Sequence, residues 1–90
     1  MSSPEFEKFT RHFIQDLDIV AKSEEDMYAF VLGFIQGEER VRLRAFLDAV
    51  TQDSVSDMEL QELWWASEAE VTFGESAHLR AMLKEARDRL

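Results

Sequence analysis

The sequence predicts an all-α protein, a compact bundle of four to five short helices that forms a single domain over residues 1–90. A chain of 90 residues can bury one modest hydrophobic core. Its 3 glycines and 1 proline leave little room for the many turns of an all-β fold. Apolar residues recur at helical spacing in separate segments, with polar or glycine-containing residues between them.

The first predicted helix begins at Ser3-Pro4 and ends near Asp16. Ser3 can accept a hydrogen bond from a free backbone amide, and proline suits the first helical position because its missing N–H would be unpaired there anyway. Phenylalanines at helical spacing mark the buried face: Phe6, Phe9 and Phe13.

The second predicted helix begins at Ser23, where Asp26 completes a weak capping box and acidic residues fill the first turn. Gly37 can adopt a left-handed conformation, so we expect it to end this helix. We expect a buried stripe of apolar residues on one face: Met27, Phe30, Val31 and Phe34.

The third predicted helix covers about residues 39–52, and its apolar face consists of Leu43, Phe46, Leu47 and Val50. The fourth has the best local signal in the chain, a capping box made by Ser56 and Glu59. Val55 and Leu60 occupy the hydrophobic-staple positions around this box. Its buried face consists of Leu60, Leu63 and Trp64.

The fifth predicted helix begins with Ser76 as its cap and carries Arg87 and Arg89 in its last turn, where cations suit the helix dipole. Its apolar face consists of Leu79, Met82, Leu83, Ala86 and Leu90. Residues 68–74 before it alternate polar and apolar, but a lone strand cannot make a sheet. We therefore expect an ordered loop whose Val71 and Phe73 reach back into the core.

The charge of the chain restricts its partners. Ten Lys and Arg residues against 19 Asp and Glu residues give a formal net charge of −9, which argues against nucleic acid and anionic membranes. Residues 45–79 contain carboxylates and neither Lys nor Arg, for a net charge of −8. This acidic stretch is either a solvated face or a surface that attracts a basic protein partner. A polar, acidic N-terminal segment and the lack of a long apolar run lead us to expect a cytoplasmic protein.

The sequence offers little for catalysis. It has no cysteine and no glycine-rich phosphate loop, and we expect neither an enzyme nor a cofactor. His12, Asp16 and Asp18 could share a metal ion if His12 and Asp16 lay on one helix face. The alternative is that His12 stacks at a helix end and the aspartates cap or terminate the helix. His78 has no partner group spaced for catalysis, so we expect it at the surface.

The adjacent pair Trp64-Trp65 cannot lie on one buried stripe, because neighbouring helical residues point about 100° apart. Trp64 continues the apolar face of its helix, so we expect it in the core. Trp65 then lies at the core edge or outside. It either covers the loop of residues 68–74 or serves as an exposed aromatic anchor for a partner.

The segment of residues 12–18, His-Phe-Ile-Gln-Asp-Leu-Asp, resembles the H-F-x-Q-D-x-D start of a family of small helical immunity proteins of contact-dependent growth inhibition systems. The resemblance extends over nearly the whole chain. Residues 23–26 resemble the S-x-E-D entry to the second helix of that family. The remaining similar segments are residues 43–47, 60–64, 73–74, 78–83 and 86–88.

The resemblance implies a protein without catalytic activity that binds and blocks the C-terminal toxin domain of a cognate exported toxin in the cytoplasm. Many such toxins are nucleases, which present a basic, phosphate-binding surface. The residues that we expect at the contact are Asp16, Asp18, Trp65, Glu68 and Glu70. Asp16 and Asp18 come from the resembling motif and could equally be structural; the others come from the acidic loop and the aromatic argument. The competing hypothesis is a small acidic adaptor that binds another protein's helix in an apolar groove.

Overall fold

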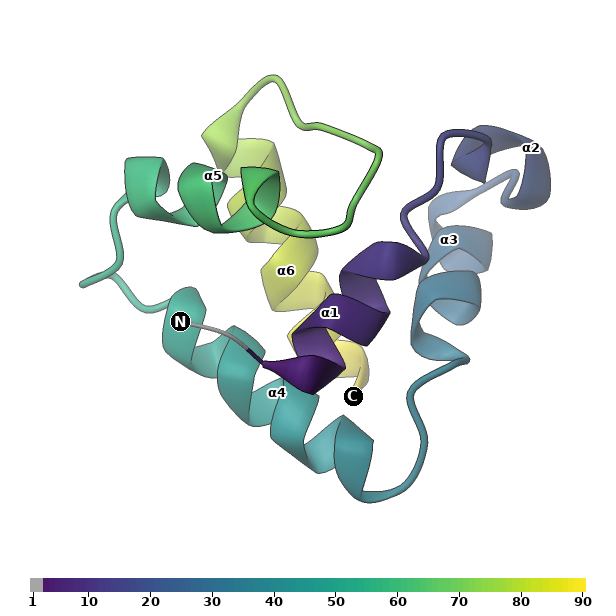
Figure 1. Ribbon diagram of the computed structural model, residues 1–90, viewed down its shortest axis with the longest axis horizontal. Helices are drawn as coiled ribbons and strands as arrows, with labels where there is room; N and C mark the ends of the chain where they lie inside the picture. The colour runs from purple at the N-terminus through teal and green to yellow at the C-terminus, as the bar shows by residue number, and fades with distance from the viewer. Residues whose placement is uncertain (1–2) are drawn as a thin grey trace.

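The computed structural model describes residues 3–90, in which the chain forms six helices and no strand (Figure 1). The predicted all-α fold is confirmed. The helices are α1 (Pro4–Arg11), α2 (Leu17–Val20), α3 (Glu24–Leu32), α4 (Glu38–Val50), α5 (Asp57–Trp65) and α6 (Ser76–Arg89). The helix beyond the predicted number is α2, a single turn in the segment that we expected to join the first two helices.

Helix α1 begins as predicted, because the Ser3 hydroxyl accepts a hydrogen bond of 3.2 Å from the Phe6 amide. Its predicted end near Asp16 is wrong. The helix ends at Arg11, and the Phe13 amide then donates to the Thr10 carbonyl at 3.0 Å in a tighter turn. Phe13 is nevertheless fully buried, so the apolar spacing was correct beyond the helix that it predicted.

Helix α3 begins at the predicted cap, where the Ser23 hydroxyl accepts from the Asp26 amide at 3.1 Å. It ends at Leu32 and does not reach Gly37, which instead precedes α4 with φ +55°. The predicted stripe is also displaced by one residue. Of the predicted residues, Val31 is buried, Met27 and Phe30 are half-buried against the core, and Phe34 is 42% exposed. The fully buried face consists of Tyr28, Val31, Leu32 and Ile35. Both stripes have helical spacing, so only the packing of α3 selects between them.

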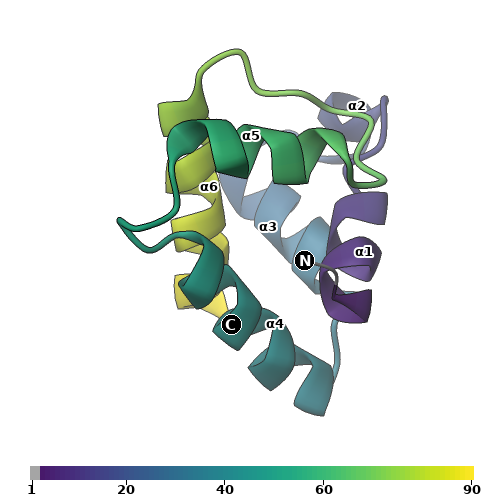
Figure 2. The same ribbon diagram turned by 60° about the vertical axis from the view of Figure 1, so that its left-hand side comes forward.

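The last three helices form close to their predicted positions. In α5 the Ser56 hydroxyl accepts from the Glu59 amide at 3.1 Å, which confirms the predicted cap. Ser76 is the first residue of α6 and does not cap it; Glu75 holds the cap position without a side-chain hydrogen bond. Helix α6 packs against both α4 and α5 (Figure 2).

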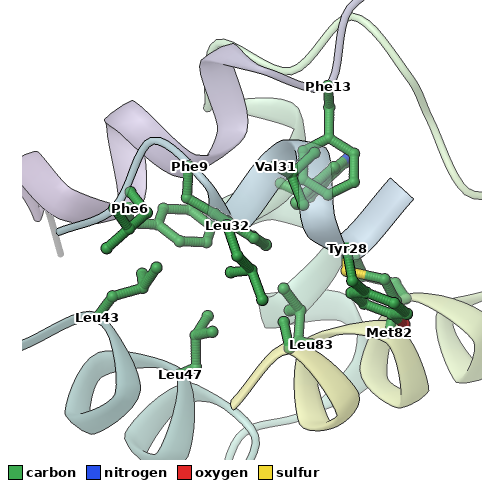
Figure 3. Close-up of a cluster of buried hydrophobic side chains, with 14 of the residues drawn as sticks. Phe6, Phe9, Phe13, Tyr28, Val31, Leu32, Leu43, Leu47, Met82 and Leu83 are labelled. Carbon is green, nitrogen blue, oxygen red and sulfur yellow. The ribbon is translucent and has the colours of Figure 1, made fainter. Parts of the chain in front are cut away.

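The core joins α1 to α4 and α5. Phe6 and Phe9 point from α1 towards Leu43 and Leu47 of α4 (Figure 3). Trp64 of α5 is 1% exposed, and its ring meets that of Phe13 edge-on with centroids 5.0 Å apart. Burial of these large aromatic side chains removes much apolar surface from water and stabilises the fold.

Two arginines fix the loops between helices. The Arg80 guanidinium donates to the carbonyl oxygens of Thr51, Gln52 and Val55 and to the Asp57 carboxylate, which holds the α4–α5 loop on α6. Arg40 donates to the carbonyl oxygens of Leu32, Ile35 and Arg89, and so ties the α3–α4 loop to the end of α6. A planar group with several donors suits this role, because carbonyls that follow a helix need outside partners.

Candidate protein-binding face

The loop of residues 66–75 lies against the end of α1 and near α2 (Figures 1 and 2). The Glu70 amide donates to the Phe13 carbonyl at 2.8 Å, and the indole Nε1 of Trp64 donates to the Val71 carbonyl at 2.7 Å. Gln61 Nε2 donates to the Phe73 carbonyl at 3.3 Å. Val71 and Phe73 pack against the core, as predicted. The loop is therefore ordered by hydrogen bonds to its backbone, while the side chains of Glu68 and Glu70 stay exposed.

Helix α2 presents the two aspartates of the resembling motif to solvent. Asp16 holds the N-cap position without a side-chain hydrogen bond, and Asp18 lies in the first turn. Leu17 between them is buried and anchors this short helix to the core. Both aspartates are exposed, and neither makes an ion pair with the residues that the structure describes.

An open groove of about 530 Å³ lies where α2, the start of α3 and the loop of residues 66–75 meet. Its lining consists of Gln15, Leu17, Asp18, Ala21, Lys22, Ser23, Glu24, Met27 and Val71. The apolar members can receive an apolar side chain, while Asp18 and Glu24 can accept hydrogen bonds from a cation. Asp18 and Val71, the residue that follows Glu70, thus line the same groove.

Glu68 and Glu70 differ in their surroundings although both are exposed. Glu68 pairs with Arg11 of α1 at 2.8 Å, and this carboxylate raises the pKa of the Arg11 guanidinium. Its charge is therefore partly compensated within the molecule. Glu70 makes no ion pair with residues 3–90 and lies next to the groove residue Val71. Glu70 is consequently the more available of the two for a partner.

Trp65 is 60% exposed, whereas its neighbour Trp64 is 1% exposed, so the predicted division of this pair is confirmed. The loop of residues 66–75 is held to α5 because Gln61 Nε2 and Trp64 Nε1 donate to loop carbonyls and the Ser67 hydroxyl donates to the Trp64 carbonyl. The groove lining does not include Trp65. The structure therefore joins Asp18 and the Glu70 segment, but it leaves Trp65 as a separate feature on α5.

The metal arrangement that we considered at His12, Asp16 and Asp18 required His12 and Asp16 on one helix, and α1 ends before either. The His12 ring instead stacks on Phe34 with centroids 3.7 Å apart and an interplanar angle of 9°. Its Nδ1 lies 2.7 Å from the Lys8 carbonyl oxygen. Within residues 3–90 no group of three His, Cys, Asp or Glu side chains is placed to hold a metal ion.

The sequence did not predict this groove, because local rules give two of its lining residues other roles. Met27 belonged to the expected buried stripe, and Glu24 was explained by its favourable place in the first turn of a helix. Both assignments follow from local rules. The one-residue displacement of the stripe turns Met27 towards α2, where with Leu17 and Val71 it lines the groove.

The fold and the site together define a small all-α protein with exposed carboxylates beside an apolar groove. No protein-family model, no curated protein and no solved structure matches the chain. None of the helices in the described part of the chain is long and apolar enough to cross a lipid bilayer.

Proposed function

We propose that this chain is a non-catalytic immunity protein of a contact-dependent growth inhibition system. It binds the C-terminal toxin domain of the cognate toxin in the cytoplasm and covers a basic surface of that domain. A nuclease is one class of toxin that fits, because its substrate-binding surface is basic. The observation that carries the proposal is that Asp18 lines the same groove as Val71, the residue after Glu70, while the Glu70 amide donates to the carbonyl of Phe13.

Three carboxylates of this face are available to a partner. Asp16, Asp18 and Glu70 are exposed, and none makes an ion pair within residues 3–90. Uncompensated surface charges steer an oppositely charged protein and raise its association rate. The same charges disfavour nucleic acid and anionic membranes as partners. The resemblance of residues 12–18 to the immunity-protein motif supports the same assignment for Asp16 and Asp18.

Inhibition then occurs by occlusion. Lys and Arg side chains of the toxin meet the carboxylates of α2 and the loop, and an apolar toxin side chain enters the groove. The bond from the Glu70 amide to the Phe13 carbonyl holds the loop, and buried Leu17 anchors α2, before the toxin arrives. A preorganised surface of this kind binds with less ordering cost than a mobile loop.

Calorimetry tests the proposal with the full chain and the C-terminal domain of the large exported protein encoded beside its gene, at two salt concentrations. We expect tight 1:1 binding that weakens at high salt, because screening reduces attraction between exposed charges. The double variant Asp16→Asn/Asp18→Asn and the variant Glu70→Gln should bind several-fold more weakly. Asp53→Asn, an exposed carboxylate of the α4–α5 loop, is the matched control and should bind like the wild type. Absence of binding between the two folded proteins would contradict the proposal.

The apolar part of the groove favours a second candidate, a small acidic adaptor that receives another protein's amphipathic helix. Leu17, Ala21, Met27 and Val71 supply the apolar lining. This function predicts an affinity that changes little with salt but falls sharply when Met27 is replaced by Ser. The salt dependence of binding therefore separates the two candidates.

A further inference from the structure

The outer face of α5 carries two large apolar side chains that are exposed to solvent. Met58, Glu62 and Trp65 follow one another at i, i+4 and i+7, so they lie on one side of the helix. Met58 is 63% exposed and Trp65 is 60% exposed. We call these three residues the α5 face. Large apolar side chains that share one exposed side of a helix are a common feature of protein interaction sites.

The opposite side of α5 packs into the core and holds the following loop. Leu60, Gln61 and Trp64 are buried, and Trp64 packs edge-on against Phe6, Phe13 and Phe73. Trp64 and Gln61 also hold the loop of residues 66–75. The α5 face can therefore be changed without removing any of these contacts.

The charge of α5 indicates which kind of partner fits. The helix carries Asp57, Glu59 and Glu62 and no basic residue. Asp57 is held by Arg80, whose remaining donors are taken by carbonyl oxygens. Neither Glu59 nor Glu62 makes an ion pair with the residues that the structure describes. An apolar partner surface without cations would leave these two carboxylates uncompensated.

We propose that the α5 face binds an arginine-bearing segment of a basic partner protein. The side chains of Met58 and Trp65 lie about 10 Å apart along the helix axis, which is two turns of a partner helix. An apolar partner side chain packs between them, one arginine pairs with Glu62, and a guanidinium stacks on the Trp65 indole. A second copy of this chain fits poorly, because a symmetric contact through this face would set Glu62 against its own copy.

This inference rests on the proposed function only for the identity of the partner, the toxin domain. The charge and chemistry of the partner segment follow from α5 itself. The α5 face then provides the apolar anchor, while Asp16, Asp18 and Glu70 provide the steering charges. Aromatic anchors of this kind carry a large share of the affinity of protein interfaces.

Tryptophan fluorescence tests the inference with the full chain and a synthetic amphipathic helix of leucine and arginine. A peptide in which glutamate replaces every arginine is its matched control. The arginine peptide should shift the emission to shorter wavelength, and the shift should vanish in Trp65→Phe because the remaining Trp64 is already buried. Trp65→Ala should weaken binding at least tenfold, and Met58→Ala and Glu62→Gln several-fold. Val41→Ala, which changes a 69% exposed apolar residue of α4, should bind like the wild type.

Two results would overturn the inference: no binding of the arginine peptide, or equal binding to the wild type, Trp65→Ala and Met58→Ala. The same variants in the toxin-domain titration keep the two proposals apart. A toxin domain whose affinity falls with the Asp16/Asp18 and Glu70 variants, but not with the α5 variants, leaves the immunity function standing and removes the α5 face from it. A toxin domain that does not bind the wild type contradicts the immunity function, and the peptide result then decides the inference alone.

Discussion

The indole Nε1 of Trp64 donates a 2.7 Å hydrogen bond to the carbonyl oxygen of Val71. Trp64 is 1% exposed and belongs to the aromatic core, whereas Val71 lies in the loop that carries Glu68 and Glu70. This bond therefore connects the hydrophobic core to the acidic segment of the candidate face. The position of Glu68 and Glu70 therefore depends on Trp64, whose side chain is buried and does not contact a partner.

Replacing Trp64 by phenylalanine should destabilise the protein by about 2–4 kcal/mol, because a buried ring shrinks and the Val71 carbonyl loses its donor. The amide of Glu70, which donates to the Phe13 carbonyl, should exchange faster with solvent as the loop loosens. Urea unfolding and hydrogen exchange measure the two effects. The matched control is Trp65→Phe, whose exposed ring should change stability by less than about 0.5 kcal/mol. Equal losses in the two variants would contradict this role for Trp64.

Helix starts could be predicted from the sequence where the signal is local. Ser3, Ser23 and Ser56 each accept the hydrogen bond that their position predicts. The buried face of α3 could not be predicted, because stripes through Phe30 and through Tyr28 satisfy the same helical period. The choice depends on how α3 meets its neighbours, and that information is distributed over the whole chain.

The candidate site, like the helices, could be predicted only in part from the sequence. Acidic side chains at residues 16–18 and 68–70 are visible in the sequence, but the sequence does not predict the hydrogen bond from the Glu70 amide to the Phe13 carbonyl, which ties the loop to the chain before α2. No residue type predicts a backbone hydrogen bond between two distant segments. The exposure of Met58 beside Trp65 could not be predicted from the apolar stripe of α5, because that stripe identifies only the buried side of the helix.

Replacing Ser56 by alanine should lower the free energy of unfolding by about 1 kcal/mol, because the Glu59 amide loses the acceptor that caps α5. Ser54→Ala, at an exposed position in the same α4–α5 loop, is the matched control and should stay within about 0.5 kcal/mol of the wild type. Chemical denaturation of both variants measures the difference. Equal stability of the two would exclude a contribution from the cap.

Arg80 holds the α4–α5 loop with donors that lysine cannot reproduce. Its Nη1 donates to the carbonyls of Thr51 and Gln52, and its Nη2 donates to the carbonyl of Val55 at 2.6 Å. Arg80→Lys keeps the charge but lacks the planar fork, so it should cost about 1–3 kcal/mol. Arg44→Lys, at an exposed position of α4, should cost less than about 0.5 kcal/mol. Thermal unfolding compares them, and a similar loss in both would refute the clamp.

The pKa values of Glu5, Glu25 and Glu39 lie below their ordinary value of 4.5, because Arg42, Arg89 and Lys8 respectively donate hydrogen bonds to them. A lowered pKa in the folded state means that these pairs stabilise the protein above the ordinary pKa. That contribution disappears as the pH falls through the lowered values. Melting temperatures of the wild type and Glu5→Gln should therefore differ at pH 7 and converge in strong acid. Glu62→Gln removes a carboxylate outside these pairs, so its melting temperature should stay close to that of the wild type at both pH values.

Gly37 and Gly74 should respond to alanine in opposite directions. Gly37 has φ +55° at the start of α4, a conformation that side chains disfavour although its Cβ would meet nothing within 4 Å. Gly37→Ala should therefore cost about 1–3 kcal/mol through backbone strain alone. Gly74 also has open space but lacks a positive φ, so alanine there restricts mainly the unfolded chain. Gly74→Ala should be neutral or stabilise by about 0.4–1 kcal/mol. Because both sites lack steric conflict, urea unfolding of the two variants isolates the backbone contribution. A Gly37→Ala variant as stable as the wild type would show that the turn before α4 does not require glycine.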